Sequence, residues 1–248
     1  MKTQGHTGFS TSGYQTGAVP GELSQLQRLL GASLAQAEEQ VAAACLRQPV
    51  TCPKCGEGGC VAQGLRRYKC SACRAGFGLF DGRWLSRRRI TPRAWVLTLK
   101  CFELGLGGQQ ISDLTGLSMP TVYKTLETIR MALACMDPHW VGLVGSLEKA
   151  PGQPWREVFA VTESGGRVRV DGQEGGEGFV YPGRHAGGRH PEGPFLRYLL
   201  RQTAKHCGIP PMSFPLYLKE YELRFNFRGR PLFEVLLEAV ARPRPSGS

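Results

Sequence analysis

CPKCGEGGCVAQGLRRYKCSAC, residues 52–73, contains two Cys-x2-Cys pairs that are separated by 14 residues. Each pair is typical of a tight turn that directs both sulfur atoms at one point. A tetrahedral zinc ion takes four soft donors of this kind at about 2.3 Å. Because four thiolates leave no coordination position open for water or substrate, the predicted zinc is structural. The predicted ligands are Cys52, Cys55, Cys70 and Cys73.

The segment around these pairs is predicted to be a zinc ribbon, with one strand over residues 61–69 and its partner over residues 77–80. A redox iron site uses the same four ligands, and a chance grouping of free thiols is a third interpretation. Cys60 is either a surplus thiol or an alternate ligand. The other cysteines are interpreted as small buried apolar side chains. These are Cys45, Cys101, Cys135 and Cys207.

The cellular setting is predicted to be the cytoplasm, in association with the nucleoid. Nine cysteines are an odd number, and residues 1–17 lack the apolar stretch of a secretory signal. Reduced thiols and metal ligation are therefore favoured over disulfides. No apolar run approaches the roughly 18 residues of a membrane span, so no membrane association is expected.

Basic residues dominate the next part of the chain. The formal net charge is +11, and residues 61–100 hold ten Lys and Arg against the single acid Asp81. A solvated surface usually mixes both signs, so this segment is predicted to contact DNA phosphates, with Trp84 along the backbone; solubility alone is the alternative. The ten are Arg66, Arg67, Lys69, Arg74, Arg83, Arg87, Arg88, Arg89, Arg93 and Lys100.

A helix-turn-helix is predicted directly after the ribbon. Thr91 is a good N-cap with a proline behind it, a short helix over 109–115 ends at Gly116, and Ser118 precedes the third helix. A three-helix packing unit without nucleic acid is the alternative. The inner stripe of the third helix is Val122, Leu126, Ile129 and Leu133. The predicted groove-reading residues are Thr121, Tyr123, Lys124, Thr125 and Thr128, with Met119 and Pro120 at the helix start.

The remaining segments complete an α+β chain. A strand pair is expected over 158–161 and 167–170, a strand over 179–181, and helices over 195–204, 214–225 and 231–241. The predicted organisation is a disordered leader (1–21), an amphipathic packing or dimer-contact helix (22–48), the zinc ribbon (49–84), the helix-turn-helix (85–138), an incomplete RNase H-like domain (139–241) and a disordered tail (242–248).

Several strings together resemble the zinc-ribbon insertion-sequence transposases with an ISXO-type DDE nuclease domain. They are CPKCG, RRYKCSACRAGF, KCFELGLGGQQISDLTGLSMPTVYKTLETIR and FPLYLKEYELRFNFR (Phe214 to Arg228), with Phe195 to Gly208 also similar. The resemblance covers 50–135 and 195–240. It implies a ribbon, a helix-turn-helix and an RNase H-like α/β domain, double-stranded DNA as the partner, and homo-oligomers, because such enzymes act on paired DNA ends.

The family's activity is the cutting and joining of DNA ends, which requires three carboxylates and two divalent metal ions, Mg²⁺ or Mn²⁺. This chain departs from the pattern at all three positions. Glu148 is a weak substitute for the first acid, Asp171 follows the hairpin too early for the second, and Glu192 stands one residue from the third. The prediction is therefore a transposase-like DNA-binding protein that has lost catalysis. An active transposase and a zinc-ribbon transcriptional or protein-interaction adaptor are the alternatives.

Overall fold

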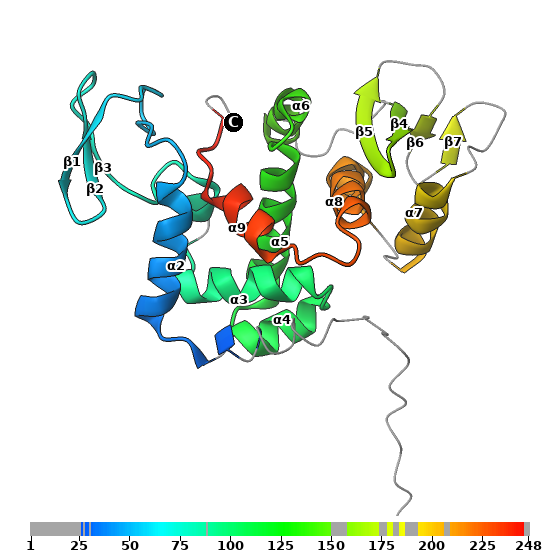
Figure 1. The fold of residues 1–248 in the computed structure, drawn as a ribbon, viewed down its shortest axis with the longest axis horizontal. Helices are drawn as coiled ribbons and strands as arrows, with labels where there is room; N and C mark the ends of the chain where they lie inside the picture. The colour runs from blue at the N-terminus through cyan, green and yellow to red at the C-terminus, as the bar shows by residue number, and fades with distance from the viewer. Residues whose placement is uncertain are drawn as a thin grey trace, which may run out of the picture.

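The computed structural model describes residues 26, 28–29, 31–87, 89–149, 158–173, 178–180, 184–186, 193–205 and 209–245. These residues form helices and two small antiparallel sheets, which confirms the α+β class (Figure 1). The helices are α2 (Leu34–Leu46), α3 (Pro92–Glu103), α4 (Gly108–Thr115), α5 (Met119–Ala134), α6 (Pro138–Lys149), α7 (Pro194–Lys205), α8 (Phe214–Asn226) and α9 (Phe233–Ala241). The strands are β1 (Cys60–Gly64), β2 (Arg67–Cys70), β3 (Gly76–Gly78), β4 (Val158–Ser164), β5 (Arg167–Gln173), β6 (Gly178–Val180) and β7 (Arg184–Ala186). The predicted leader lies outside the described residues.

The first sheet has the order β1-β2-β3, and it corrects the prediction of one long strand over 61–69. That segment is a hairpin: β1 pairs with β2 so that Cys60 lies opposite Cys70. The chain reverses between the two strands, where Arg66 adopts a left-handed φ of 59°. We call residues 50–82, which hold this sheet and both cysteine pairs, the cysteine module.

The predicted helix over 22–48 is interrupted: the described residues 26, 28–29 and 31 are helical, residues 32–33 are not, and Ser33 forms a capping box at the start of α2. Its hydroxyl accepts a hydrogen bond from the Gln36 N–H at 3.2 Å, and the Gln36 side chain accepts one from the Ser33 N–H at 2.8 Å. This reciprocal pair satisfies two of the amide groups that a helix start leaves free, and so fixes the start of α2 at Leu34.

The helices of the predicted helix-turn-helix form close to their expected bounds. The Thr91 hydroxyl accepts a hydrogen bond from the Ala94 N–H at 3.2 Å and caps α3, and Gly116 ends α4 with a φ of 71°. The stripe from Val122 to Leu133 on α5 is buried as predicted. Ser118 stands at the N-cap position of α5, but its hydroxyl is hydrogen-bonded to the Thr121 hydroxyl rather than to the backbone.

The second sheet has the order β5-β4-β6-β7, and every pairing in it is antiparallel. The predicted β4–β5 hairpin is confirmed, with left-handed φ values at both turn glycines. Side chains of α8 cover the edge of β5: the Asn226 amide exchanges two hydrogen bonds with the Val168 backbone at 2.8 and 2.7 Å, and Glu222 accepts one from the Val170 N–H at 2.9 Å. An edge covered in this way cannot recruit another strand.

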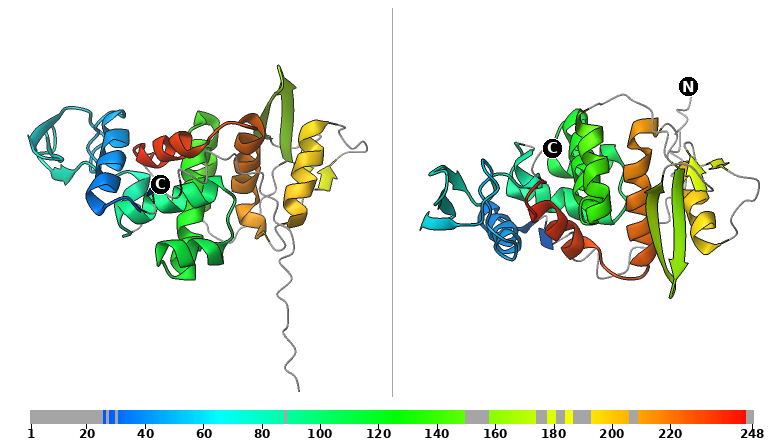
Figure 2. Two further views of the ribbon diagram at one scale, coloured as in Figure 1. Left: turned by 60° about the horizontal axis from the view of Figure 1, so that its bottom comes forward. Right: turned by 90° about the horizontal axis from the view of Figure 1, so that it is seen from above.

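One continuous hydrophobic core joins both halves of the chain. α9 packs against α2, α3 and α5, and α8 packs against α5. Figure 1 shows α9 between α2 and α5, and Figure 2 shows α8 on one side of the β4–β5 hairpin and α7 on the other. The core cluster runs from Leu29 to Ala241, so the predicted boundary at 138/139 does not separate two cores. None of the described helices is long and apolar enough to cross a membrane.

The predicted disordered tail is ordered over residues 242–245. Pro243 forms a β-bridge with Arg83, and the Arg244 N–H donates to the Gly82 carbonyl at 2.9 Å. The two residues of each contact are about 160 positions apart in the chain, so no local signal in the sequence indicates these contacts. The tail fastens the end of α9 to the loop that leaves the cysteine module.

Replacing Gly82 by alanine is expected to lower the free energy of unfolding by about 2–5 kcal/mol. Gly82 has a φ of 72°, and an added Cβ would lie 2.6 Å from Cβ of Pro53. A left-handed alanine costs roughly 1–2 kcal/mol and an overpacked contact about 1–3 kcal/mol. Urea unfolding measures the loss. The control is Gly58→Ala, where an added Cβ meets no atom within 4 Å; equal losses in the two variants would contradict the prediction.

Candidate metal centre and nucleic-acid interface

The two cysteine pairs lie on turns of matching geometry. In the first turn the Gly56 N–H donates to the Cys52 carbonyl at 2.9 Å, and in the second the Arg74 N–H donates to the Cys70 carbonyl at 3.1 Å. Gly56 and Arg74 are each four residues beyond the first cysteine of their pair, and each has a left-handed φ, 78° and 60°. The chain therefore makes the same reversal twice, although a residue other than glycine occupies the second one.

The four predicted ligands converge on one point. The sulfur atoms of Cys52 and Cys73 are 3.5 Å apart, those of Cys55 and Cys70 are 3.6 Å apart, and all four lie within 4.8 Å of one another. A tetrahedral metal with sulfur ligands at about 2.3 Å needs sulfur–sulfur distances of about 3.8 Å, whereas a disulfide needs about 2.05 Å. The cluster therefore fits a metal such as zinc and does not fit a disulfide.

Cys60 lies outside the cluster. Its sulfur lies 3.5 Å from the Glu57 carbonyl, and it does not belong to the group of four. Two of the remaining cysteines, Cys45 and Cys101, are buried as predicted, while Cys135 is only half-buried. Cys207 lies outside the described residues.

Backbone amides support a thiolate at the first cysteine of each pair. Burial raises the pKa of Cys52, but hydrogen bonds from the N–H groups of Cys55 and Lys54 and from neighbouring thiols lower it to about 7. The N–H of Cys73 is the largest influence on Cys70, and it lowers the pKa of that thiol although burial opposes it. The Glu57 N–H lowers the pKa of Cys55, but burial and the surrounding thiols raise it to about 12. Deprotonation of Cys55 near neutral pH therefore requires a cation beside it.

The predicted phosphate-contacting residues divide by exposure. The side chains of the exposed group face solvent, and none of Arg67, Lys69 and Arg74 has an ion-pair partner within the described residues. Arg66 instead is held by two carboxylates of α2, Glu38 and Glu39. Arg87 and Arg93 are half-buried, and Arg88 lies outside the described residues. The exposed group is Arg67, Lys69, Arg74 and Arg89.

Three members of the basic segment are interior residues, which corrects the prediction for them. Arg83 is 3 % exposed and donates to the carbonyls of Leu79, at 2.7 Å, and Ala241. Trp84, expected along the DNA backbone, is buried. Lys100 is fully buried and forms an ion pair with Glu103. These three side chains are therefore not surface contacts for phosphates.

Fewer of the predicted groove-reading residues on α5 are accessible than expected. Tyr123 and Lys124 are exposed and Thr121 is half-buried, but Thr125 and Thr128 are buried. The hydroxyls of the two buried threonines donate back to the carbonyls of Thr121, at 2.7 Å, and Lys124, at 2.8 Å. Thr125 lies three residues after Val122 and four before Ile129, and Thr128 lies three and four residues before the buried Met131 and Ala132. Helical periodicity therefore places both threonines on buried parts of the helix surface.

The cysteine module and the start of α5 are separate surfaces. The module lies at one end of the long axis, whereas α4 and the start of α5 lie below α3 (Figure 1). The left view of Figure 2, in which the bottom of Figure 1 comes forward, shows the same separation. The residues predicted to contact phosphates and those predicted to read the groove therefore lie on two separate surfaces.

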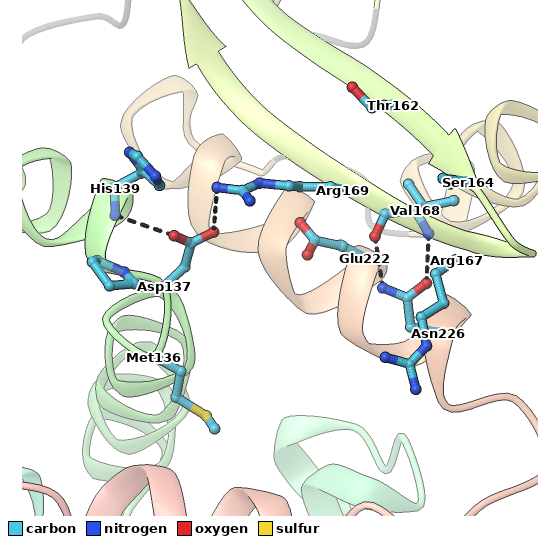
Figure 3. A pocket seen from close by; sticks show the side chains of 11 residues that line it. Met136, Asp137, His139, Thr162, Ser164, Arg167, Val168, Arg169, Glu222 and Asn226 are labelled. Carbon is cyan, nitrogen blue, oxygen red and sulfur yellow. Dashed lines mark hydrogen bonds and ion pairs between the residues drawn. The ribbon is translucent and has the colours of Figure 1, made fainter.

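The acid that the sequence singled out in the hairpin is paired with arginine. Asp171 on β5 contacts the Arg169 guanidinium at 2.9 Å, and Arg169 also reaches Asp137 at 3.8 Å. Figure 3 shows Asp137 facing Arg169 across a pocket of about 620 Å³, which Glu222 also lines. Lys219 contacts Asp137 at 3.1 Å and Glu222 at 2.8 Å. Each of these three carboxylates is therefore already paired with a protein cation.

The structure does not gather a carboxylate triad from the described residues. Within that part of the chain, the four cysteines are the one group of three or more His, Cys, Asp or Glu close enough to hold a metal. Glu148, the weak substitute for the first acid, lies in helix α6. Glu192 lies outside the described residues. Sequence reasoning missed Asp137 and Glu222, because their partners come from distant segments.

Comparison of the chain with protein-family models, with curated proteins and with solved structures finds no match. Function therefore has to be inferred from the chemistry of the cysteine cluster and the charged surfaces.

Proposed function

We propose that this protein binds duplex DNA through a zinc-stabilised cysteine module, in the manner of the insertion-sequence transposases it resembles, and does not cut the DNA. The observation that carries the proposal is the four-sulfur cluster beside exposed cations that have no ion-pair partner among the described residues. Cys70 ends β2 and Cys73 follows it, and Arg67, Lys69 and Arg74 lie on or directly beside this strand.

Zinc would act here by folding the surface that contacts DNA. Bound to Cys52, Cys55, Cys70 and Cys73, it would supply structural cross-linking. Arg67 and Lys69 are two residues apart on β2, so their side chains leave the same face of the strand. Stacking of Tyr68 on Phe77 at 5.8 Å fixes the opposite face. The cations thus have the regular spacing that suits successive backbone phosphates.

A second contact is proposed at the start of α5. Lys124 and Tyr123 are exposed there, and the Tyr123 ring lies against Gly108, where an added Cβ would be 3.1 Å from the ring. This contact holds the aromatic ring beside the N-terminal end of α4. The start of an exposed helix with these side chains suits the major groove, and base contacts there would supply sequence preference.

The proposal predicts a specific salt dependence. The double variant Arg67→Ala/Arg74→Ala is expected to weaken binding to a labelled duplex and to reduce the slope of log K against log salt by about 2, because each phosphate contact contributes about 0.9. Fluorescence anisotropy over a salt series measures it. The matched control is Arg197→Ala/Arg201→Ala, which removes two exposed charges from α7. Equal slopes in both variants, or no salt-dependent binding by the unaltered protein, would refute the proposal.

Cleavage is tested in the same mixtures. Mg²⁺ or Mn²⁺ is expected to leave the duplex uncut, because Arg169 and Lys219 occupy the carboxylates around the pocket. Metal-dependent strand cleavage that disappears in Asp171→Ala would instead establish an active transposase. Denaturing gels resolve the two results.

A further inference from the structure

A cleft lies between the first cysteine turn and the C-terminal tail. It has a volume of about 570 Å³, and its walls are residues 50–56, 81–83 and 243–245, with Phe77 and Leu79. The tail forms one wall because Pro243 bridges to Arg83 and the Arg244 N–H binds the Gly82 carbonyl. Pro53 fits against Gly82, so the opposite wall is fixed too. The cleft is thus built before any ligand arrives.

Positive charge predominates in this cleft. Lys54, Arg83 and Arg244 line it, against one acid, Asp81. Asp81 accepts a hydrogen bond from the Gly78 N–H at 2.7 Å and forms no ion pair with the three cations. Apart from the cysteines, the side chains that line the cleft therefore carry three positive charges against one negative charge.

None of the three cations has a carboxylate partner within the described residues. The Arg83 guanidinium donates to two backbone carbonyls, and Lys54 has no partner among the described side chains. The Arg244 Nε is buried without an acceptor. Arg83 and the Arg244 Nε are buried, whereas Lys54 is exposed at the mouth of the cleft. Buried cationic groups are normally paired, because removing them from water is costly. An anion in the cleft would supply the missing partner.

We propose that this cleft binds a backbone phosphate of the DNA, with Lys54 and Arg244 as its direct contacts and Arg83 as a fixed positive charge behind them. The inference rests on the proposed function and adds a contact that the exposed residues of β2 do not provide. A phosphodiester suits the cleft because arginine offers several N–H donors in one plane and binds phosphate oxygens in pairs. Fixed walls keep the entropy cost of binding small.

The metal centre is the competing source of negative charge. Four thiolates around Zn²⁺ carry a net charge of −2, and Cys52 and Cys55 line the same cleft. The sulfurs already accept hydrogen bonds from backbone N–H groups, those of Lys54 and Cys55 on Cys52 and those of Ala72 and Cys73 on Cys70. These bonds stabilise the thiolates, so the cations of the cleft are not the only groups that do so.

The test compares DNA binding with metal retention in the full-length protein. Arg244→Ala keeps the backbone N–H that binds Gly82, and it is expected to weaken duplex binding about tenfold, as for one lost charge-assisted hydrogen bond. The slope of log K against log salt should fall by about 1. Lys54→Ala should behave alike, Arg244→Lys should restore the slope, and the control Arg201→Ala should change neither. Zinc content, measured by a chromogenic chelator, should remain that of the unaltered protein.

Three results would overturn the inference. In the first, Arg244→Ala and Lys54→Ala leave the slope unchanged while Arg67→Ala/Arg74→Ala still reduces it. This result would refute the phosphate contact in the cleft but not the proposed function. In the second, Arg244→Ala loses zinc, and DNA binding falls only in proportion to the zinc lost. This result would show that the cations stabilise the metal centre and do not contact DNA. Absence of salt-dependent duplex binding by the unaltered protein would remove both proposals together.

Discussion

Replacing Cys70 by serine is expected to abolish metal binding and, with it, the fold of the cysteine module. Cys70 is fully buried, its sulfur lies 3.6 Å from that of Cys55, and its residue ends β2. A serine hydroxyl is a poor zinc ligand because it keeps its proton near neutral pH. Structural zinc in small fingers contributes about 10–16 kcal/mol of apparent binding energy, which is folding energy for a module of this size. Duplex binding should fall at least as far as in Arg67→Ala/Arg74→Ala.

The control for this prediction lies directly across the sheet. Cys60 is paired with Cys70 in the register of β1 and β2 but is not among the four converging sulfurs. Cys60→Ser should therefore keep one metal per chain. Elemental analysis gives the metal and its identity, and hydrogen exchange shows whether residues 52–82 lose protection while α3 and α5 keep theirs. Equal metal content in Cys70→Ser and the unaltered protein would contradict the prediction, and bound iron would favour the redox alternative.

Local signals were sufficient to predict the cysteine cluster and the helices α3, α4 and α5. Spacing alone identified Cys52, Cys55, Cys70 and Cys73, because a Cys-x2-Cys turn is made by adjacent residues. Thr91 and Gly116 marked helix ends in the same way, since caps act within one turn. The apolar stripe on α5 followed from a period that any single helix imposes.

The burial of charged side chains was not predictable from these signals. Arg83 lies in a basic run that reads as a surface, yet its acceptor on Ala241 is 158 residues away. Lys100 is buried because α9 and the Leu232 and Phe233 amides surround its partner Glu103. A composition count cannot distinguish a cation that faces DNA from one that holds two distant helices together. Contacts between distant segments also explain why the predicted boundary at 138/139 does not divide the core. The helices α8 and α9 pack into the same core as α3 and α5.

The core between α5 and α8 depends on a buried carboxylate. Glu220 on α8 contacts Arg130 on α5 at 2.6 Å and Arg224 at 2.7 Å. Arg224 also donates to the carbonyls of Phe102 and Glu103 at the end of α3. The Arg130 guanidinium lies over the Tyr217 ring at 3.9 Å from its centroid. One negative charge therefore compensates two guanidinium groups where three helices meet.

Replacing Glu220 by glutamine is expected to lower the free energy of unfolding by about 3–5 kcal/mol, because it leaves buried guanidinium groups without an anion. The variant keeps the shape of the side chain, so the loss reports charge and not volume. Urea unfolding at pH 7 measures it. The control is Glu234→Gln, which removes an exposed pair of 3.7 Å with Arg47 and should cost less than about 1 kcal/mol. Equal costs for the two substitutions would show that the network does not stabilise the core.

The same carboxylate predicts how stability changes with pH. Burial raises the pKa of Glu220, but Arg130 and Arg224 outweigh it and lower the pKa to about 2. An unfolded chain has this pKa near about 4.3. Since the folded value is the lower one, the contribution is complete above about pH 4.3 and is lost as the pH falls toward 2. The unaltered protein should therefore lose stability more steeply than Glu220→Gln over that interval, and parallel pH profiles for the two proteins would show that Glu220 is not held ionised by its arginines.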